Sequence, residues 1–201
     1  MKLFYAPHTR AECVRWLLDE MMVDYDVVFV DFEKGEHKSD FYKSLHPLGQ
    51  LPALEDEGNI IIERAAIMMH LVDRFRAKNM APPPGGPQRA AFYQFMVYGV
   101  ATLEPAAVAL LTATDAEKNA ARARFDEVIT VLENNLIHNA GGSWLFGQQF
   151  TAADCLIGSQ MMWFFDQGWL EGRDRLIKYV KDCADRPAFR QVPTDFPVAE
   201  Q

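Results

Sequence analysis

The chain has 201 residues, of which 49% are apolar and 24% charged, and its formal net charge is −8. This length allows one large domain or two modest ones that fold without disulfide or metal staples, and the composition is that of a globular protein. Nucleic-acid-binding proteins usually carry a basic face, so the acidic balance argues against an extended phosphate-binding surface. We therefore expect no nucleic-acid partner.

The sequence carries no pattern typical of export, membrane insertion or metal binding. The first twelve residues, MKLFYAPHTRAE, lack the apolar region of a signal peptide, and no apolar run approaches the roughly 20 residues that span a bilayer. Cys13, Cys155 and Cys183 have neither the spacing of a disulfide framework nor histidine partners for zinc. We expect a cytoplasmic protein with no membrane association, free thiols and no metal.

The first part of the chain alternates between strand and helix patterns. Residues 2–30 read as strand, helix and strand in KLFY, AECVRWLLDEM and YDVVFV, which predicts a βαβ unit with a parallel pair and a right-handed crossover. A polar loop with a short helix follows, and then two short apolar runs around the turn at residues 57–59, which favour an antiparallel hairpin. Residues 64–76 have the period of a helix, so the predicted order is βαβαββα.

A linker at residues 78–88 contains four of the eleven prolines and two glycines, a composition that neither helix nor strand tolerates. It predicts a domain boundary, with one domain over residues 1–77 and a second over residues 89–201. The helical period dominates the second domain. Within its first long helix, Pro105 predicts a kink or break near residues 101–102, because a proline ring clashes with the carbonyl one turn back.

Two stretches of the second domain have the pattern of a helix capping box. Thr114 with Glu117 precedes one helix, and Thr151 with Asp154 precedes another, where Phe150 occupies the hydrophobic-staple position. The second helix is apolar around most of its circumference, so we expect its start to be buried and its orphan amides to need the cap. Loss of the Asp154 side chain is expected to lower stability by roughly 1 to 2 kcal/mol.

These features together resemble the cytosolic glutathione transferases. The most specific part is residues 45–75, which read LHPLGQLPALEDEGNIIIERAAIMMHLVDRF. They are similar to the family pattern N-P-x-G-x-[VL]-P-x-L, followed by a hairpin and E-S-x-A-I. The resemblance implies a thioredoxin-like N-terminal domain followed by an all-α domain, and a homodimer. The same scaffold also carries members that are not transferases.

The resemblance implies a set of glutathione-binding residues. Pro52 is expected to be a cis proline that presents the backbone of Leu51 to an extended peptide ligand, as an added strand would; the alternative is that the pair only starts an edge strand. Glu63 is expected to hold the amino group of the ligand, and the first helical turn after it favours a carboxylate. The candidates for the glycyl carboxylate, which otherwise belong to solvent-facing loops, are His37, Lys38 and Gln50.

Arg64 is the clearest departure from the family, which usually has Ser or Thr at this position. A cation in the first turn of a helix is unfavourable by roughly 0.3 to 1 kcal/mol. A bound carboxylate would offset this cost through the fork of guanidinium donors. The alternative is a solvated Arg64 that pairs loosely with Glu63 or Glu57. If Arg64 holds the carboxylate, Arg64→Ala should raise the half-saturating concentration of glutathione.

The thiol of glutathione needs a group that stabilises its thiolate. Lowering a pKa by two units takes about 2.7 kcal/mol, which one charge-assisted hydrogen bond at a helix N-terminus nearly supplies. The family places this group between the end of the first strand and the start of the first helix. Thr9 is the first candidate here, Arg10 the second and Tyr5 the third. Cys13 is expected to be buried; if it were reactive, the protein would be a thiol oxidoreductase.

The resemblance places the second substrate against the first helices of the second domain, where apolar and methionine side chains form adaptable walls. It implies a glutathione transferase that activates glutathione, its co-substrate, as a thiolate for attack on a small hydrophobic electrophile, as in detoxification. One alternative is a non-catalytic binding or regulatory protein, and another is a glutathione-dependent thiol transferase or isomerase. The candidates for the wall of the electrophile site are Phe95, Met96, Gly99 and Leu103.

Overall fold

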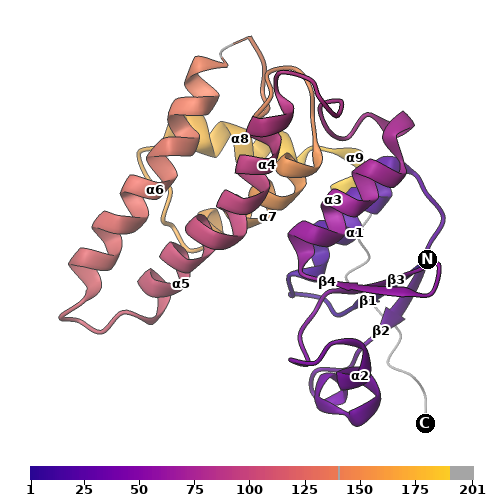
Figure 1. Cartoon of the computed structure of the whole chain (residues 1–201). Helices are drawn as coiled ribbons and strands as arrows, with labels where there is room; N and C mark the ends of the chain where they lie inside the picture. The colour runs from indigo at the N-terminus through magenta and orange to yellow at the C-terminus, as the bar shows by residue number, and fades with distance from the viewer. Residues whose placement is uncertain (140, 191–201) are drawn as a thin grey trace. The chain divides into compact units, whose positions relative to one another are not determined.

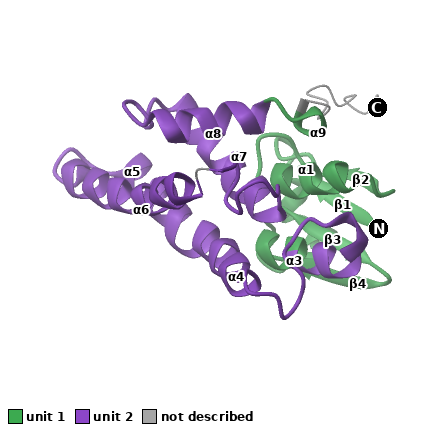
Figure 2. Ribbon diagram, turned by 90° about the horizontal axis from the view of Figure 1, so that it is seen from above, with its two compact units in different colours: residues 1–68, 185–201 green, residues 69–184 purple. Residues whose placement is uncertain are grey.

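The computed structural model describes residues 1–139 and 141–190 (Figure 1). The chain forms two compact units (Figure 2). Unit 1 contains residues 1–68 together with the described residues from Asp185 onward, and unit 2 contains residues 69–184. The proline-rich stretch at residues 78–88 lies within unit 2 by this division. The domain boundary expected there from composition stays a prediction.

Unit 1 is built on a four-stranded mixed sheet with the strand order β2-β1-β3-β4. β1 and β2 are parallel and are connected through a helix, as the βαβ pattern predicts, and β3 runs antiparallel to both β1 and β4. Glu57 and Gly58, both with positive φ, form the hairpin turn between β3 and β4. The strands are β1 (Lys2–Tyr5), β2 (Asp26–Phe29), β3 (Ala53–Asp56) and β4 (Asn59–Ile62).

Helices of unit 1 complete the predicted order βαβαββα, so the thioredoxin-like fold is confirmed. α1 buries Val14, Leu17 and Leu18 among its core residues, and the sheet contributes Leu3 and Leu54 to the core. The helical segments are α1 (Ala11–Met21), η1 (Glu36–Lys38), α2 (Asp40–Leu45), the first residues of α3 (Arg64–Arg74) and α9 (Pro187–Arg190).

The end of the described chain returns to unit 1 and fastens α9 to α1. The guanidinium of Arg186 forms a two-point ion pair with the Glu20 carboxylate, with Nη2 2.6 Å from Oε2. The rings of Trp16 and Phe189 meet edge to face with their centroids 5.0 Å apart. Two contacts of different chemistry thus hold α9 on one face of α1.

Unit 2 is helical in the part of the chain that the structure describes. α7 and α8 pack together, α5 packs on α6, and the rings of Phe125, Phe164 and Trp169 form the centre of an aromatic cluster. The segments are η2 (Arg76–Lys78), α4 (Arg89–Tyr98), the π-helical turn η3 (Gly99–Leu103), α5 (Glu104–Thr112), α6 (Lys118–His138), α7 (Ala152–Asp166) and α8 (Asp174–Ala184).

Backbone and side-chain contacts fix the proline-rich stretch within unit 2. Arg89 Nη1 donates to the Pro82 carbonyl at 2.9 Å, and Arg89 Nη2 lies 2.7 Å from Asp73 Oδ1. The Met80 carbonyl accepts the backbone N–H of Ala152 at 2.8 Å. Within the stretch, the Gly86 N–H closes one turn on the Pro83 carbonyl at 2.9 Å, and the contacts with its surroundings fix its path.

The interruption predicted from Pro105 is present as a change from α-helical to π-helical hydrogen bonding. A proline lacks the N–H and crowds the carbonyl one turn back, and the preceding residues 99–103 adopt a π-helical turn between α4 and α5. Helical structure continues across it from Arg89 to Thr112. Among the described residues, this is the one helix whose length and composition alone would let it cross a membrane, and 33% of its most apolar stretch is buried.

The capping box at α7 is confirmed. Asp154 Oδ2 accepts the backbone N–H and the hydroxyl of Thr151, both at 2.9 Å, while Asp154 Oδ1 accepts the Leu145 N–H at 2.9 Å and the Tyr179 hydroxyl at 3.1 Å. Burial raises the pKa of the Asp154 carboxyl to about 6. One carboxylate therefore joins the start of α7 to the preceding loop and to α8.

The box expected at Thr114 is only partly formed. Glu117 reaches back to the hydroxyl and the backbone N–H of Thr114, at 2.7 and 3.1 Å. The Thr114 carbonyl, however, closes a turn by accepting the N–H groups of Glu117 and Lys118, and α6 begins at Lys118. The prediction that Thr114 itself caps the helix was wrong, because the turn comes before the first helical residue.

Candidate functional site

The register of the sheet brings three loop segments to one end of unit 1. Ala53, the first residue of β3, pairs with Phe4 near the end of β1 and with Ile62 at the end of β4. The loop that leaves β1, the segment that enters β3 and the residue that follows β4 therefore emerge at the same sheet edge. These segments contain Thr9 and Leu51–Pro52 as well as Glu63, which lie far apart in the sequence.

The Leu51–Pro52 peptide bond is cis, as expected from the resemblance. Both residues are buried. The paired register of β3 begins only at Ala53, so the N–H and C=O of Leu51 lie outside the ladder. A backbone segment in this position is able to pair with an extended peptide in the manner of an added strand.

The segment that leads into Leu51 is fastened to η1 and α2. Lys38 Nζ donates to the carbonyl oxygens of Leu48 and Gly49, at 3.0 and 3.1 Å. The Tyr42 hydroxyl donates to the Gln50 carbonyl at 2.7 Å. Two side chains thus hold consecutive carbonyls of one loop, so the backbone of Gln50 and Leu51 has a defined position before any ligand arrives.

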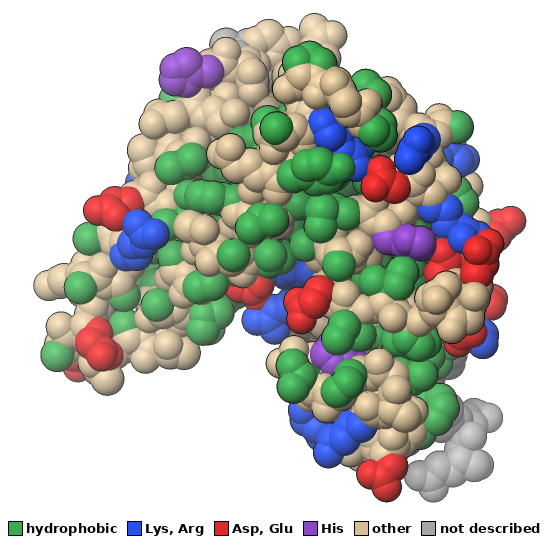
Figure 3. Space-filling view, in the orientation of Figure 1, with side chains coloured by type: hydrophobic (Ala, Val, Ile, Leu, Met, Phe, Trp, Pro, Cys, Tyr) green, Lys and Arg blue, Asp and Glu red, His purple; other side chains and the backbone are tan. Residues whose placement is uncertain are grey.

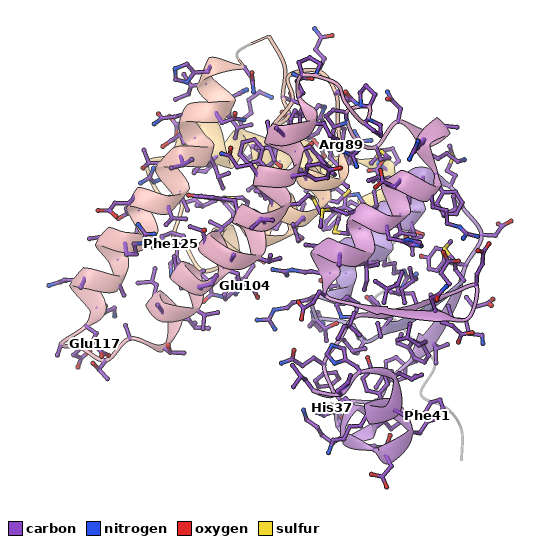
Figure 4. All side chains as sticks on the ribbon, viewed as in Figure 1. His37, Phe41, Arg89, Glu104, Glu117 and Phe125 are labelled. Carbon is purple, nitrogen blue, oxygen red and sulfur yellow. The ribbon has the colours of Figure 1, made fainter. Side chains whose placement is uncertain are left out.

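Gly49 is required by close packing at the same place. Its φ is +58°, and a Cβ added there would lie 2.3 Å from the His37 carbonyl oxygen. The His37 ring stacks on Phe32 with centroids 4.0 Å apart. Figure 4 shows His37 in the small lobe formed by η1 and α2, with Phe41 on the same lobe. Of the three candidates for the glycyl carboxylate, Lys38 and Gln50 are exposed and His37 is half-buried.

The junction of β4 and α3 places opposite charges in different environments. Glu63 is exposed and has a φ of +69°, a left-handed conformation that costs about 1 to 2 kcal/mol in a residue other than glycine. Its carbonyl accepts the Ile67 N–H at 2.9 Å, so it closes the first turn of α3. Arg64 is only 6% exposed. This burial does not fit a solvated side chain, and the pairing with Glu63 or Glu57 that was part of the alternative stays a prediction.

Thr9 uses both hydrogen-bonding functions of its hydroxyl inside its own loop. The hydroxyl donates to the Ala6 carbonyl at 2.6 Å and accepts the Ala11 N–H at 3.3 Å. A hydroxyl has one proton to donate. A thiolate bound here would therefore have to compete with Ala6 for that proton.

The other thiolate candidates differ sharply in exposure. Arg10 is exposed just before α1, whereas Tyr5 is fully buried, with Arg15 5.2 Å from its ring centroid. Burial, and then the nearby Glu12 carboxylate, raise the pKa of Tyr5. Cys13 is buried with its sulfur 3.3 Å from the Arg10 carbonyl, as expected for a packed thiol.

The four candidates for the electrophile wall are all buried within unit 2. The Phe95 ring meets Phe146 edge to face, with centroids 5.9 Å apart. Gly99 lies against α7, where its carbonyl accepts from Gln160 Nε2 at 2.8 Å. Met96 and Leu103 are fully buried. Their proposed contact with a substrate stays a prediction.

Sequence reasoning did not single out Tyr42 and took His46 for a structural residue, and the structure places both beside the loop that leads into Leu51. Tyr42 is buried and holds Gln50 by its hydroxyl. His46 is 2% exposed, stacks on Tyr42, and its Nδ1 has no hydrogen-bond partner among the described residues. The one available signal was His46 itself, which stands where the transferase pattern has asparagine.

No group of three or more His, Cys, Asp or Glu residues in positions 1–139 and 141–190 is arranged to hold a metal ion. The site as built consists of a free backbone edge, an exposed carboxylate, a buried guanidinium and an exposed lysine. Such a set suits a ligand with peptide groups, an amine and carboxylates.

Comparison with known proteins agrees with this chemistry. Residues 1–73 match the family model "Glutathione S-transferase, N-terminal domain". Glutathione S-transferase GstA of Escherichia coli O157:H7 is 28% identical over 192 residues, covering 93% of this chain and 94% of that protein. A sphingomonad glutathione S-transferase solved with glutathione is 27% identical, with a TM-score of 0.80 over 94% of this chain and 96% of that chain.

A third relative is not named as a transferase. Protein URE2 of Candida glabrata is 40% identical over 62 residues, which cover 29% of this chain and 18% of that protein.

Proposed function

Because the chain belongs to the cytosolic glutathione S-transferase family, we propose that it binds glutathione on unit 1 and activates its thiol for attack on a small hydrophobic electrophile. One observation carries this proposal: because Ala53 pairs with Ile62, the segment before β3, with Leu51, and the residue after β4, Glu63, lie at the same sheet edge. The edge supports backbone pairing, and Glu63 supports capture of the amine.

Glutathione has charged groups at its γ-glutamyl end and at its glycyl end, and unit 1 offers groups of opposite charge for each. The Glu63 carboxylate takes the α-ammonium group, and the free amides at the start of α3 take the adjacent carboxylate, where the helix dipole is positive. Arg64 begins this helix and adds a guanidinium fork for the same carboxylate. Lys38, whose ammonium has three donors, holds the carbonyls of Leu48 and Gly49 and has one donor left for the glycyl carboxylate.

The thiol lies toward the loop between β1 and α1 in this arrangement. Thr9 stabilises the thiolate if its proton turns from the Ala6 carbonyl to the sulfur, and Arg10 stabilises it by charge. The thiolate then attacks the electrophile, which binds against apolar side chains, and the bond to the leaving group breaks as the carbon–sulfur bond forms. No residue of the chain is consumed in this reaction.

One experiment separates the transferase from its alternatives. Calorimetric titration with glutathione is followed by an assay of conjugation to chlorodinitrobenzene. We expect binding and turnover. Binding without turnover, on this and other aryl or alkyl electrophiles, would favour a thiol transferase or isomerase, and absence of binding would favour a non-catalytic protein.

The non-catalytic reading has one specific observation in its favour. The Thr9 hydroxyl donates at 2.6 Å to Ala6, so the first candidate for thiolate stabilisation is engaged elsewhere. A thiol transferase that used Cys13 is less favoured, because this sulfur is buried and a mixed disulfide requires access to it.

A further inference from the structure

Tyr42 connects the sheet of unit 1 to the loop that precedes β3. Its ring meets Phe4 of β1 edge to face, with centroids 5.9 Å apart, and stacks on His46, with centroids 6.5 Å apart. Its backbone N–H donates to the Ser39 hydroxyl at 3.2 Å, at the start of α2. Only 2% of the residue is exposed, so packing fixes the side chain, and it acts on a ligand only through its neighbours.

The neighbour that matters is the peptide group between Gln50 and Leu51. The Tyr42 hydroxyl donates to the Gln50 carbonyl at 2.7 Å. The Gln50–Leu51 peptide is trans, so the Gln50 carbonyl and the Leu51 N–H lie in one plane and point in opposite directions. A hydroxyl that fixes the direction of the carbonyl therefore also fixes the direction of the N–H, which faces away from Tyr42. The Leu51 N–H has no hydrogen-bond partner in residues 1–139 and 141–190, so it is available to a ligand.

The same hydrogen bond makes the Leu51 N–H a better donor. A peptide group whose carbonyl accepts a hydrogen bond is polarised, and hydrogen bonds in a chain strengthen one another. Burial raises the pKa of Tyr42, so its hydroxyl keeps the proton that it donates. The preceding carbonyls, of Leu48 and Gly49, accept from Lys38 Nζ. Three consecutive peptide groups that lead into Leu51 are therefore held by side chains.

We propose that Tyr42 is a positioning residue of the glutathione site: its hydroxyl holds the Gln50 carbonyl and so presents the Leu51 N–H to the peptide backbone of the ligand. This inference rests on the proposed function. Without the hydroxyl, the Gln50–Leu51 peptide is free to turn, and only the fraction of molecules with a correctly directed N–H binds. The apparent dissociation constant then rises as this fraction falls. Lys38 is less suited to a test, because it is itself a candidate contact of the ligand.

The test is the variant Tyr42→Phe, which removes one oxygen, with glutathione affinity measured by calorimetry at pH 7.0. We expect the dissociation constant to rise about threefold to tenfold, the effect of one neutral hydrogen bond. The thiol pKa of bound glutathione, followed by ultraviolet absorbance, should keep its wild-type value, because Tyr42 directs a backbone donor and does not touch the sulfur. In wild-type protein, the hydroxyl proton of Tyr42 should be visible by NMR before glutathione is added, since its hydrogen bond does not require the ligand.

Tyr98→Phe is the matched control. It removes another hydroxyl that donates to a backbone carbonyl, that of Val128 at 3.0 Å, in unit 2 instead of unit 1. It should keep the wild-type affinity for glutathione. Wild-type affinity in a folded Tyr42→Phe protein, an equal loss of affinity in Tyr98→Phe, or a Tyr42 hydroxyl proton that appears only with glutathione would overturn the inference while the proposed function stands. Failure of the wild-type protein to bind glutathione would instead refute the proposed function.

Discussion

At the scale of single residues, Thr9 and Arg10 offer two different ways to stabilise the thiolate. Thr9 has the right position, but its hydroxyl already donates to Ala6; Arg10 is exposed and would act by its charge. The two mechanisms predict different variants. A hydrogen bond is lost when the hydroxyl is removed, whereas a charge effect is lost when the cation is neutralised and is weakened by salt.

The first prediction concerns the thiol pKa of bound glutathione, followed by the ultraviolet absorbance of the thiolate against pH. If Thr9 is the donor, Thr9→Val should raise this pKa by about 1 to 2 units, because a hydrogen bond to a charged group contributes about 1.5 to 3 kcal/mol. Thr9→Ser should retain the wild-type value. Arg10→Gln should leave it nearly unchanged at high salt. If only Arg10→Gln raises the pKa, the assignment moves to Arg10.

The second prediction concerns Arg64. Arg64 is buried at the first residue of α3, and a ligand carboxylate at this helix start would form charge-assisted hydrogen bonds with its guanidinium. Arg64→Ala should raise the half-saturating glutathione concentration at least tenfold, since a charge-assisted hydrogen bond contributes about 1.5 to 3 kcal/mol. Arg64→Lys keeps the charge but loses the forked guanidinium donors, so its half-saturating concentration should lie between those of the wild type and Arg64→Ala. An unchanged value in a folded Arg64→Ala protein would remove this residue from the site.

At the scale of elements, local sequence patterns predicted the features that are decided by residues close together in the chain. The βαβαββα order, the interruption before Pro105 and the cap at α7 all follow from local patterns, and each is present. The contacts that complete the site join residues farther apart in the chain: the Tyr42 hydroxyl donates to the Gln50 carbonyl, and Ala53 pairs with residues of both β1 and β4. Burial of Arg64 and the partner of the Thr9 hydroxyl also depend on tertiary packing, so no local pattern contains them.

The third prediction concerns the start of α7. Asp154→Ala removes the acceptor from two buried backbone N–H groups and the Tyr179 hydroxyl, at about 1 to 3 kcal/mol for each group left unsatisfied. We expect a loss of at least 3 kcal/mol in urea unfolding, which exceeds the loss expected from capping alone. Asp166→Asn, at the exposed end of the same helix, should change stability little.

The pH dependence of the same carboxyl provides an independent check. The folded state raises the Asp154 pKa from 3.8 to about 6, so it binds the proton more tightly than the unfolded chain does. This contribution to stability is complete below about pH 4 and is lost as the pH rises through about 6. Asp154→Asn should therefore lose stability relative to wild type more at pH 4.5 than at pH 7, and an equal loss at both values would contradict the raised pKa.

At the scale of the whole molecule, unit 2 exposes apolar side chains along its first helices. Tyr93, Val97, Val108 and Leu111 are exposed on the helical stretch from Arg89 to Thr112, and hydrophobic side chains gather over α4, α5 and α6 (Figure 3). Apolar patches of this kind on soluble proteins mark interaction sites. The family resemblance implies a homodimer, so we propose that a second copy of the chain covers this face.

The fourth prediction tests this assembly. Val97 and Leu111 are each 53% exposed, so lysine at either position is tolerated in a monomer but becomes a buried, unpaired charge in the proposed interface. The double variant Val97→Lys, Leu111→Lys should therefore be monomeric by light scattering where the wild type is dimeric, with the helical circular dichroism retained. Phe165→Lys introduces the same charge at an exposed apolar site of α7 and should remain a dimer. A wild-type monomer, or a double variant that still dimerises, would show that something other than a second copy covers the face.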